Sequence, residues 1–230
     1  MKQLSDSKIY EQELQYWPYI KSWKKVLNYL VKNTPRNGTL IDIMCGPGYL
    51  LGKIAQKRKD LSLYGVDIDK RYISFSKKKY PKINFTIGNV LTYKSKQLYD
   101  VVICTGSLHH VPYEKQDKAV KNMASMVKQN GFCLISDCLM DDYDNEKQRK
   151  ISAAKLGYEY LRKTIQNGAP DNVVEATIDI LYNDVMMHEY KTSLKKRMPV
   201  YKKYFSKVQT IKVWPKTKTK YGDYIMICKK

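Results

Sequence analysis

The chain has 230 residues, enough for one domain with an elaboration and a sizeable core, and no run of about 18 apolar residues that would suggest a membrane-spanning helix. Its 42 lysines and arginines against 22 acidic residues give a net charge of +20, which raises the question of nucleic-acid binding. Because only six of the basic residues are arginine and the lysines are spread over nearly every segment, we interpret the charge as a general surface bias and keep nucleic-acid binding as the less favoured alternative.

Residues 1–34 are predicted to form a helical lid. Apolar and aromatic residues recur at helical spacing from Lys8 to Val31, and Pro18 divides this stretch into two helices. The aromatic residues of this region have two interpretations, a cover over a cofactor or packing of the first helix: Tyr10, Tyr16, Trp17 and Tyr19. A turn at 35–38, Pro-Arg-Asn-Gly, follows the second helix.

Residues 35–140 alternate between short apolar runs and helical patterns. Five runs are predicted strands: 39–44, 61–66, 83–87, 101–105 and 132–136. The predicted helices between them are 49–58, 70–79 and 114–128, with a short helix near Ser95. This rhythm predicts an α/β fold, a doubly wound Rossmann-like sheet that is mostly parallel and carries helices on both faces.

The rhythm changes after Leu139. Residues 141–191 are predicted to form a helical insert whose first helix stops at Asn167-Gly168, and the second helix, 171–190, should bury one face. That face holds Val174, Ile178, Leu181 and Val185. Residues 192–230 are predicted to hold a helix that is kinked or broken at Pro199 and two antiparallel strands, 208–214 and 224–228.

The most informative stretch is Leu40–Gly48, an apolar run that ends in an acid and a Gly-x-Gly turn. Gly46 and Gly48 let the backbone approach a ligand closely, which is how a dinucleotide-type fold presents its first strand to an adenosine-containing cofactor. Asp67 lies 21 residues beyond Gly46, at the predicted end of the second strand. A carboxylate at that place accepts both hydroxyls of a ribose.

Two further strand ends complete the pattern. Asn89 follows the third strand, where a short polar side chain reaches the edge of an adenine. The fourth strand ends in Leu-His-His-Val, and His110, then His109, are candidate general bases because an unperturbed imidazole titrates near neutral pH. In the alternative, one histidine packs in the wall of the crevice and the other caps a turn. Asp137 and Cys138 after the fifth strand are further acceptor-side candidates.

This set of motifs resembles the class I S-adenosylmethionine-dependent methyltransferases, in particular small-molecule enzymes whose fourth strand ends in Leu-His-His-Val. The resemblance is close over 39–137 and implies a seven-stranded sheet with one antiparallel strand and S-adenosylmethionine as the cofactor. By position it implies contacts to the methionine part, the ribose, the adenine and the sulfonium side of that cofactor. The methionine part would contact Asp42, Cys45, Gly46 and Gly48, and the ribose would contact Asp67. The adenine would contact Ile68, Asn89 and Val90, and the sulfonium side would contact Thr105 and Ser107.

Two positions depart from the family pattern. Met44 stands where the family usually has glycine, and Asn89 stands where it usually has an acid. We expect Met44 to narrow the methionine end of the cofactor pocket. We expect Asn89 to keep a hydrogen-bond acceptor but to lack the negative charge of the usual acid.

The leading functional hypothesis is methyl transfer from S-adenosylmethionine to a small organic acceptor, at O, N or C, by in-line displacement. An RNA or protein methyltransferase that uses the basic surface and a non-catalytic cofactor-binding homologue are the alternatives. A nicotinamide-dependent dehydrogenase fits less well, because Asp42 lies where such enzymes have an apolar residue. The absence of an apolar leader and of any C-x-x-C pair predicts a cytoplasmic protein with free thiols and no metal ligands.

Acceptor choice is expected to lie in the insert and the N-terminal helices, which fold over the open ends of the strands. Five residues of the insert either line an acceptor pocket or form the insert's own core: Tyr158, Tyr160, Tyr182, Met186 and Met187. His188 has two interpretations, a place facing the crevice and a surface position, of which we favour the second. The acceptor itself and the oligomeric state are not encoded in any pattern we recognise.

Overall fold

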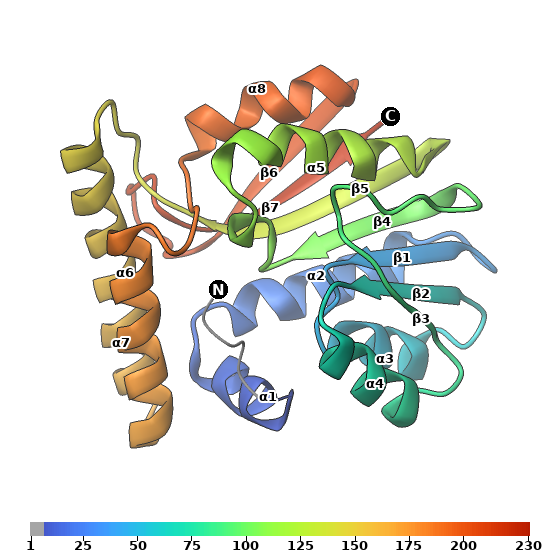
Figure 1. Ribbon diagram of the computed structural model, residues 1–230, viewed down its shortest axis with the longest axis horizontal. Helices are drawn as coiled ribbons and strands as arrows, with labels where there is room; N and C mark the ends of the chain where they lie inside the picture. The colour runs from blue at the N-terminus through green and yellow to red at the C-terminus, as the bar shows by residue number, and fades with distance from the viewer. Residues whose placement is uncertain (1–6) are drawn as a thin grey trace.

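Seven strands form a single sheet in this computed structural model, which describes residues 7–230 (Figure 1). Their order across the sheet is β3-β2-β1-β4-β5-β7-β6. The strands are β1 (Thr39–Ile43), β2 (Ser62–Asp67), β3 (Asn84–Ile87), β4 (Tyr99–Thr105), β5 (Val127–Leu139), β6 (Lys207–Trp214) and β7 (Gly222–Lys229). β7 is antiparallel to both neighbours and the other pairs are parallel, which confirms the predicted sheet.

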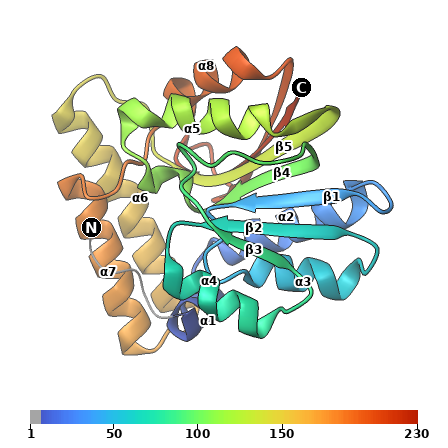
Figure 2. The same cartoon turned by 45° about the vertical axis from the view of Figure 1, so that its right-hand side comes forward.

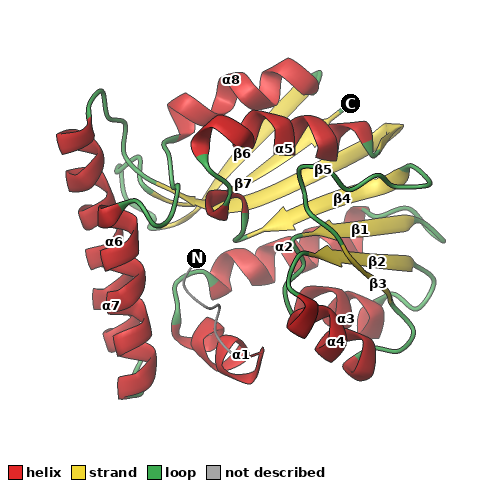
Figure 3. Cartoon of the chain, in the orientation of Figure 1, coloured by secondary structure: helices red, strands yellow, loops and turns green. Residues whose placement is uncertain are grey.

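Helices cover both faces of the sheet (Figure 3). They are α1 (Ser7–Tyr16), α2 (Ile20–Asn33), α3 (Tyr49–Lys57), α4 (Lys70–Lys79), α5 (Tyr113–Ser125), α6 (Glu146–Gln166), α7 (Asp171–Met186) and α8 (Leu194–Tyr204), with a 3-10 turn η1 (Leu108–His110). α2, α3 and α4 lie on one face, and α5 and α8 on the other. No helix within residues 7–230 is long and apolar enough to cross a membrane.

The central strands read as continuous apolar runs because both of their faces are covered. In β1, Leu40 joins the core cluster under α2 and α3, while Ile41 and Ile43 join the cluster under α5 and α8, as the two-residue period of a strand requires. β1 lies between β2 and β4. The chain first extends the sheet to one side of β1, through β2 and β3, and then to the other side, beginning with β4. Ligands of such sheets bind outside the carboxyl ends of the strands at that switch point.

Two predicted details of the core are wrong. No helix forms near Ser95: residues 88–98 form an irregular loop with one turn. The Asn122 side chain holds this loop, since its Nδ2 donates to the carbonyls of Val90 and Tyr93 at 2.8 and 3.0 Å. An outside donor therefore satisfies the carbonyls that a helix would have used. The second detail is the end of the helix predicted over 114–128, since α5 ends at Ser125 and β5 already begins at Val127.

α6 and α7 form a helical hairpin beside the sheet, and they lie together in both views (Figure 1 and Figure 2). The predicted stop is confirmed, since Gly168 has a φ of +73° and α7 begins at Asp171. The predicted apolar face of α7 is wrong, because Ile178 is 48% exposed and the buried residues include Val173 and Thr177. Thr177 Oγ1 accepts a hydrogen bond of 2.9 Å from Trp17 Nε1, so contact with the N-terminal region sets the buried side.

The two chain ends follow the sequence pattern closely. α1 and α2 meet at the expected break around Pro18, and β6 and β7 form the expected antiparallel pair. The side chain of Tyr10 lies outside the described part of the structure. α8 continues through Pro199 without the predicted break. Pro199 is the sixth of the eleven residues of α8, so it removes one backbone hydrogen bond from the middle of a helix that nonetheless continues to Tyr204.

Candidate functional site

The turn after β1 has a left-handed backbone at three positions. Met44, Gly46 and Gly48 have φ angles of +64°, +52° and +73°. The N–H groups of Met44 and Cys45 donate to the carbonyl of Val66 at 2.7 and 3.1 Å, which fixes the turn against β2. The positive φ at Met44 is a physical reason for glycine to be usual there, since another residue costs about 1–2 kcal/mol in this conformation.

The two glycines of the turn differ in their surroundings. A Cβ added to Gly48 would lie 2.8 Å from Phe85 Cζ, so this glycine lets α3 approach the sheet. A Cβ added to Gly46 would meet nothing within 4 Å, so open space lies beside the backbone of Gly46. A ligand therefore has access to the turn at Gly46, whereas an added carbon at Gly48 would clash with the protein itself.

Asp67 ties the turn to the end of β2. Its Oδ2 accepts from the Gly46 N–H and its Oδ1 from the Asp69 N–H, both at 2.8 Å. Burial raises the pKa of Asp67, and these two bonds oppose the shift. Each oxygen of a carboxylate has a second lone pair, so Asp67 remains able to accept from a diol. The next acid, Asp69, caps α4 by accepting from the Arg71 N–H, as an ordinary N-cap residue does.

Asp42 is the buried acid behind the turn. Its side chain is 2% exposed, and its Oδ1 has no hydrogen-bond partner among the described residues. Burial raises its pKa well above the ordinary value, and the nearby charge of Asp67 adds to this. Burial also raises the pKa of the Cys45 thiol, so that residue is neutral. An unsatisfied buried acid beside a second acid favours a cationic partner.

The predicted adenine side is partly exposed. Ile68 is 56% exposed just beyond Asp67, and Val90 is buried. The side-chain oxygen of Asn89, expected to serve the ligand, accepts from the Leu91 N–H at 2.9 Å. Asn89 therefore helps to hold its own turn, a role that the sequence pattern did not reveal.

The end of β4 lies within hydrogen-bond distance of the turn after β1. Ser107 Oγ lies 3.2 Å from the carbonyl of Met44 and 2.9 Å from that of Thr105, and it can donate to either. The hydroxyl of Tyr19 donates to Ser136 on β5, and its ring lies 3.2 Å from where a Cβ of Gly106 would be. The N-terminal segment thus packs directly onto the strand end that precedes the histidines.

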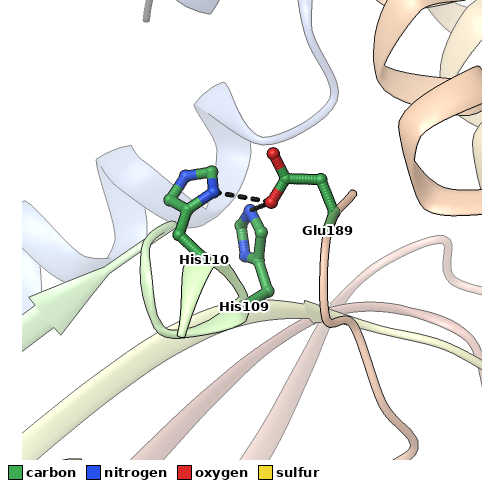
Figure 4. Close-up of side chains that lie close together, drawn as sticks. All are labelled: His109, His110 and Glu189. Carbon is green, nitrogen blue, oxygen red and sulfur yellow. Dashed lines mark hydrogen bonds and ion pairs between the residues drawn. The ribbon is translucent and has the colours of Figure 1, made fainter. Parts of the chain in front are cut away.

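The two histidines follow in η1 and each faces a carboxylate. His109 is buried, and its Nδ1 lies 2.5 Å from Asp137 Oδ1. Burial alone would lower the pKa of His109, but the charge of Asp137 and their hydrogen bond outweigh it and raise the pKa. His110 is 37% exposed at its side chain, and its Nδ1 lies 2.6 Å from Glu189 Oε2 (Figure 4). That same oxygen is 4.0 Å from His109 Nε2.

Glu189 was not predicted, and the tertiary structure alone brings it to the histidines. The Tyr190 N–H donates to the carbonyl of His109 at 2.7 Å, and the Tyr113 hydroxyl donates to the carbonyl of Lys191 at 2.6 Å. Lys191 in turn makes a buried ion pair with Asp184 at 2.7 Å. No local signal marks these residues, because the segment follows the end of a helix without a motif.

The other acceptor-side candidates divide into buried and exposed groups. The Cys138 thiol is buried and lies 3.0 Å from the hydroxyl of Tyr160 and 3.3 Å from Asp223 Oδ1. His188 is exposed, as expected, and stacks on Tyr182. Four of the five insert residues are exposed rather than part of a core: Tyr158, Tyr182, Met186 and Met187.

Comparison with known proteins agrees with this geometry. Residues 40–131 match the family model described as a methyltransferase domain. An uncharacterised methyltransferase of Bacillus mycoides (strain KBAB4) is 21% identical over 162 residues, which are 70% of this chain and 74% of that protein.

Solved structures of low sequence identity share the fold. Magnesium protoporphyrin IX methyltransferase from Synechocystis PCC 6803 with bound SAH has a TM-score of 0.63 at 17% identity and covers 99% of this chain and 90% of its own. A TehB-like SAM-dependent methyltransferase from Corynebacterium glutamicum has a TM-score of 0.59 at 11% identity, over 92% of this chain and 96% of its own. The matching region, the glycine turn, the acids at the ends of β1 and β2 and the order of the sheet are those of a methyltransferase domain with the fold of the S-adenosylmethionine-dependent enzymes.

Proposed function

We propose that the protein transfers the methyl group of S-adenosylmethionine to a small organic acceptor held by the side chains after β4. The observation that carries this proposal is the distance of 3.2 Å between Ser107 Oγ and the carbonyl of Met44, which brings the histidine turn beside the cofactor turn. A group held by His109 or His110 therefore lies beside the predicted sulfonium end of the cofactor. Magnesium protoporphyrin IX, the substrate named for one protein of similar fold, is also a small molecule, which supports this class of acceptor.

The cofactor contacts follow from the strand ends. The open space at Gly46 and the unsatisfied oxygen of Asp42 suit the cationic methionine part, and Asp67 has lone pairs for the ribose. Exposed Ile68 offers an apolar surface for the adenine. The full set proposed to line the cofactor is Asp42, Cys45, Gly46, Gly48, Asp67, Ile68, Asn89, Val90, Thr105 and Ser107.

The reaction needs alignment more than chemical activation. When bound, S-adenosylmethionine supplies a methyl carbon that is already electrophilic because its sulfur is positively charged. The chain then has to place an acceptor lone pair in line with the bond to sulfur and to exclude water. We assign the positioning of the acceptor, and assistance in the loss of its proton, to the cluster of His109, His110 and Glu189. The helical insert 141–191 and the N-terminal lid 1–34 are proposed to flank this acceptor.

Calorimetric titration with S-adenosylmethionine tests the cofactor site. We expect Asp67→Ala to weaken binding by at least about tenfold, or roughly 1.4 kcal/mol, because both ribose contacts are lost. Asp69→Ala is the matched control, since it removes the cap of α4 and the ion pair with Arg71 but no proposed cofactor contact, and it should leave the affinity unchanged. Equal affinity of the Asp67 variant and the natural protein would refute the ribose role. A natural protein that binds neither S-adenosylmethionine nor its demethylated product would refute the proposed function.

A further inference from the structure

Three ligand atoms converge after β4. One atom each from His109, His110 and Glu189 lies within 4.8 Å of the others, and the three side chains point toward one another from two separate segments (Figure 4). Two imidazole nitrogens and one carboxylate oxygen form a ligand set typical of first-row transition metals such as Zn²⁺. Mg²⁺ and Ca²⁺ prefer oxygen ligands alone.

The distances are close to those of a metal site. A four-coordinate Zn²⁺ with bonds of about 2.1 Å places neighbouring ligand atoms about 3.4 Å apart. The oxygen of Glu189 is 2.6 Å from His110 Nδ1 and 4.0 Å from His109 Nε2, on either side of that value. The shorter distance is a hydrogen bond, in which a proton takes the position between the two atoms that a cation would occupy. A shift of the Glu189 carboxylate by a fraction of an ångström away from His110 and toward His109 brings both distances into range.

His109 is oriented as a metal ligand. Its Nδ1 faces Asp137, which can only accept while it is ionised, so Nδ1 carries the proton and the Nε2 lone pair is directed toward Glu189. Asp137 is itself buried and fixed by the N–H of Cys138 at 3.0 Å. A carboxylate behind a ligating histidine is the usual outer partner of a metal-bound imidazole. This second contact distinguishes the cluster from three polar residues that meet by chance.

The local charges also favour a cation. Glu189, Asp137 and Asp184 bring three negative charges to this region. The positive charges are those of Lys191, which is paired with Asp184 at Nζ–Oδ distances of 2.7 and 2.8 Å, and of buried Arg197, which acts on Asp137. The histidines add no charge when neutral. His110 and Glu189 keep exposed surface, so further coordination positions are open to an acceptor.

We propose that His109, His110 and Glu189 bind one divalent transition-metal ion of the Zn²⁺ type, with Asp137 as the outer partner of His109. This site departs from our expectation that the chain has no metal ligands. Its role in the reaction rests on the proposed function: the ion would hold an acceptor through an oxygen atom and ease the loss of its proton to water. The oxygen lone pair then forms the bond to the methyl carbon, and the electrons of the broken carbon–sulfur bond stay on sulfur.

Metal binding can be measured without turnover. Tag-free protein, stripped of metal with a chelator, is titrated with Zn²⁺ in a calorimeter and with Co²⁺ by its visible absorption. We expect one Zn²⁺ per chain, and His110→Ala and Glu189→Gln should each weaken binding by at least about tenfold. His188→Ala is the matched control, because this exposed histidine stacks on Tyr182 outside the cluster and should leave binding unchanged.

The result separates this site from the cofactor site. We expect the His110 and Glu189 variants to bind S-adenosylmethionine normally, which also shows that they are folded, and Asp67→Ala to bind Zn²⁺ normally. Absence of Zn²⁺ binding by the natural protein, or equal binding by both cluster variants, would overturn the metal site while leaving the methyltransferase assignment intact. Equal competition by Mg²⁺ would overturn the transition-metal assignment.

Discussion

The two halves of the candidate site are built in different ways. In the cofactor half, formed by the ends of β1, β2 and β3, backbone conformation and short-range bonds do the positioning, as in the contact between Gly46 and Asp67, 21 residues apart. In the acceptor half, formed by η1, the end of β5 and residues 184–193, charged side chains from distant segments face one another. The bond between His110 and Glu189 spans 79 residues.

This difference indicates which substitutions should destabilise each half. A turn with left-handed residues is sensitive to the identity of its glycines, because only they adopt such φ values without cost. A buried group of charges is sensitive to the loss of any one partner, because the remaining charge has no water to replace it. Three substitutions test this contrast.

The largest effect is expected in the acceptor half. Lys191→Met leaves Asp184 buried without its partner and should lower the free energy of unfolding by about 3–5 kcal/mol in urea denaturation. The double variant Lys191→Met with Asp184→Leu should recover most of that loss, since no unpaired charge remains. If the single variant is as stable as the natural protein, the acceptor half does not depend on this pair.

A smaller effect is expected in the cofactor half. Gly48→Ala combines a left-handed backbone with a contact of 2.8 Å to Phe85, and we expect a loss of about 2–3 kcal/mol in the same assay. Gly168→Ala is the matched control, because it has the same φ of +73° but nothing within 4 Å of the added carbon. It should cost about 1 kcal/mol. Equal losses would show that packing against Phe85 contributes nothing.

The third effect concerns the change of stability with pH, and it is the smallest within any one pH unit. Burial raises the pKa of Asp223 to about 7, although bonds from the hydroxyl of Tyr160 and the thiol of Cys138 oppose the shift. The folded state thus holds a proton that the unfolded chain releases near pH 4, so this contribution to stability is full below about pH 4 and is lost as the pH rises to 7. Relative to Asp223→Asn, the natural protein should lose up to about 1.4 kcal/mol per pH unit between pH 5 and 7.

The control for this measurement is Asp60→Asn. The hydrogen bond from Arg58 lowers the pKa of Asp60, so its titration lies well below this range and the slope between pH 5 and 7 should not change. Parallel curves for the natural protein and the Asp223 variant would show that the Asp223 carboxyl is ionised throughout.

The features predicted from the sequence are those with a local cause. Apolar runs predicted the strands that contribute to both core clusters. Turn residues predicted the break between α1 and α2 at Pro18 and the end of α6 near Gly168. The short helix near Ser95 was wrong because Asn122, far along the chain, supplies the donors that hold that loop. The buried face of α7 was wrong because its side is chosen by contact with Trp17.

The sequence by itself determined the fold and pointed to the proposed cofactor, because the glycine turn, the acids of β1 and β2 and the alternation of strands and helices are all patterns of neighbouring residues. Only the tertiary structure decided the acceptor half. Glu189 and Lys191 reach the histidines through the backbone bond from Tyr190 to His109, and no spacing in the chain encodes that meeting. Side chains that meet only through packing carry no periodic signal, so the proposed metal cluster became visible once the segments were placed in space.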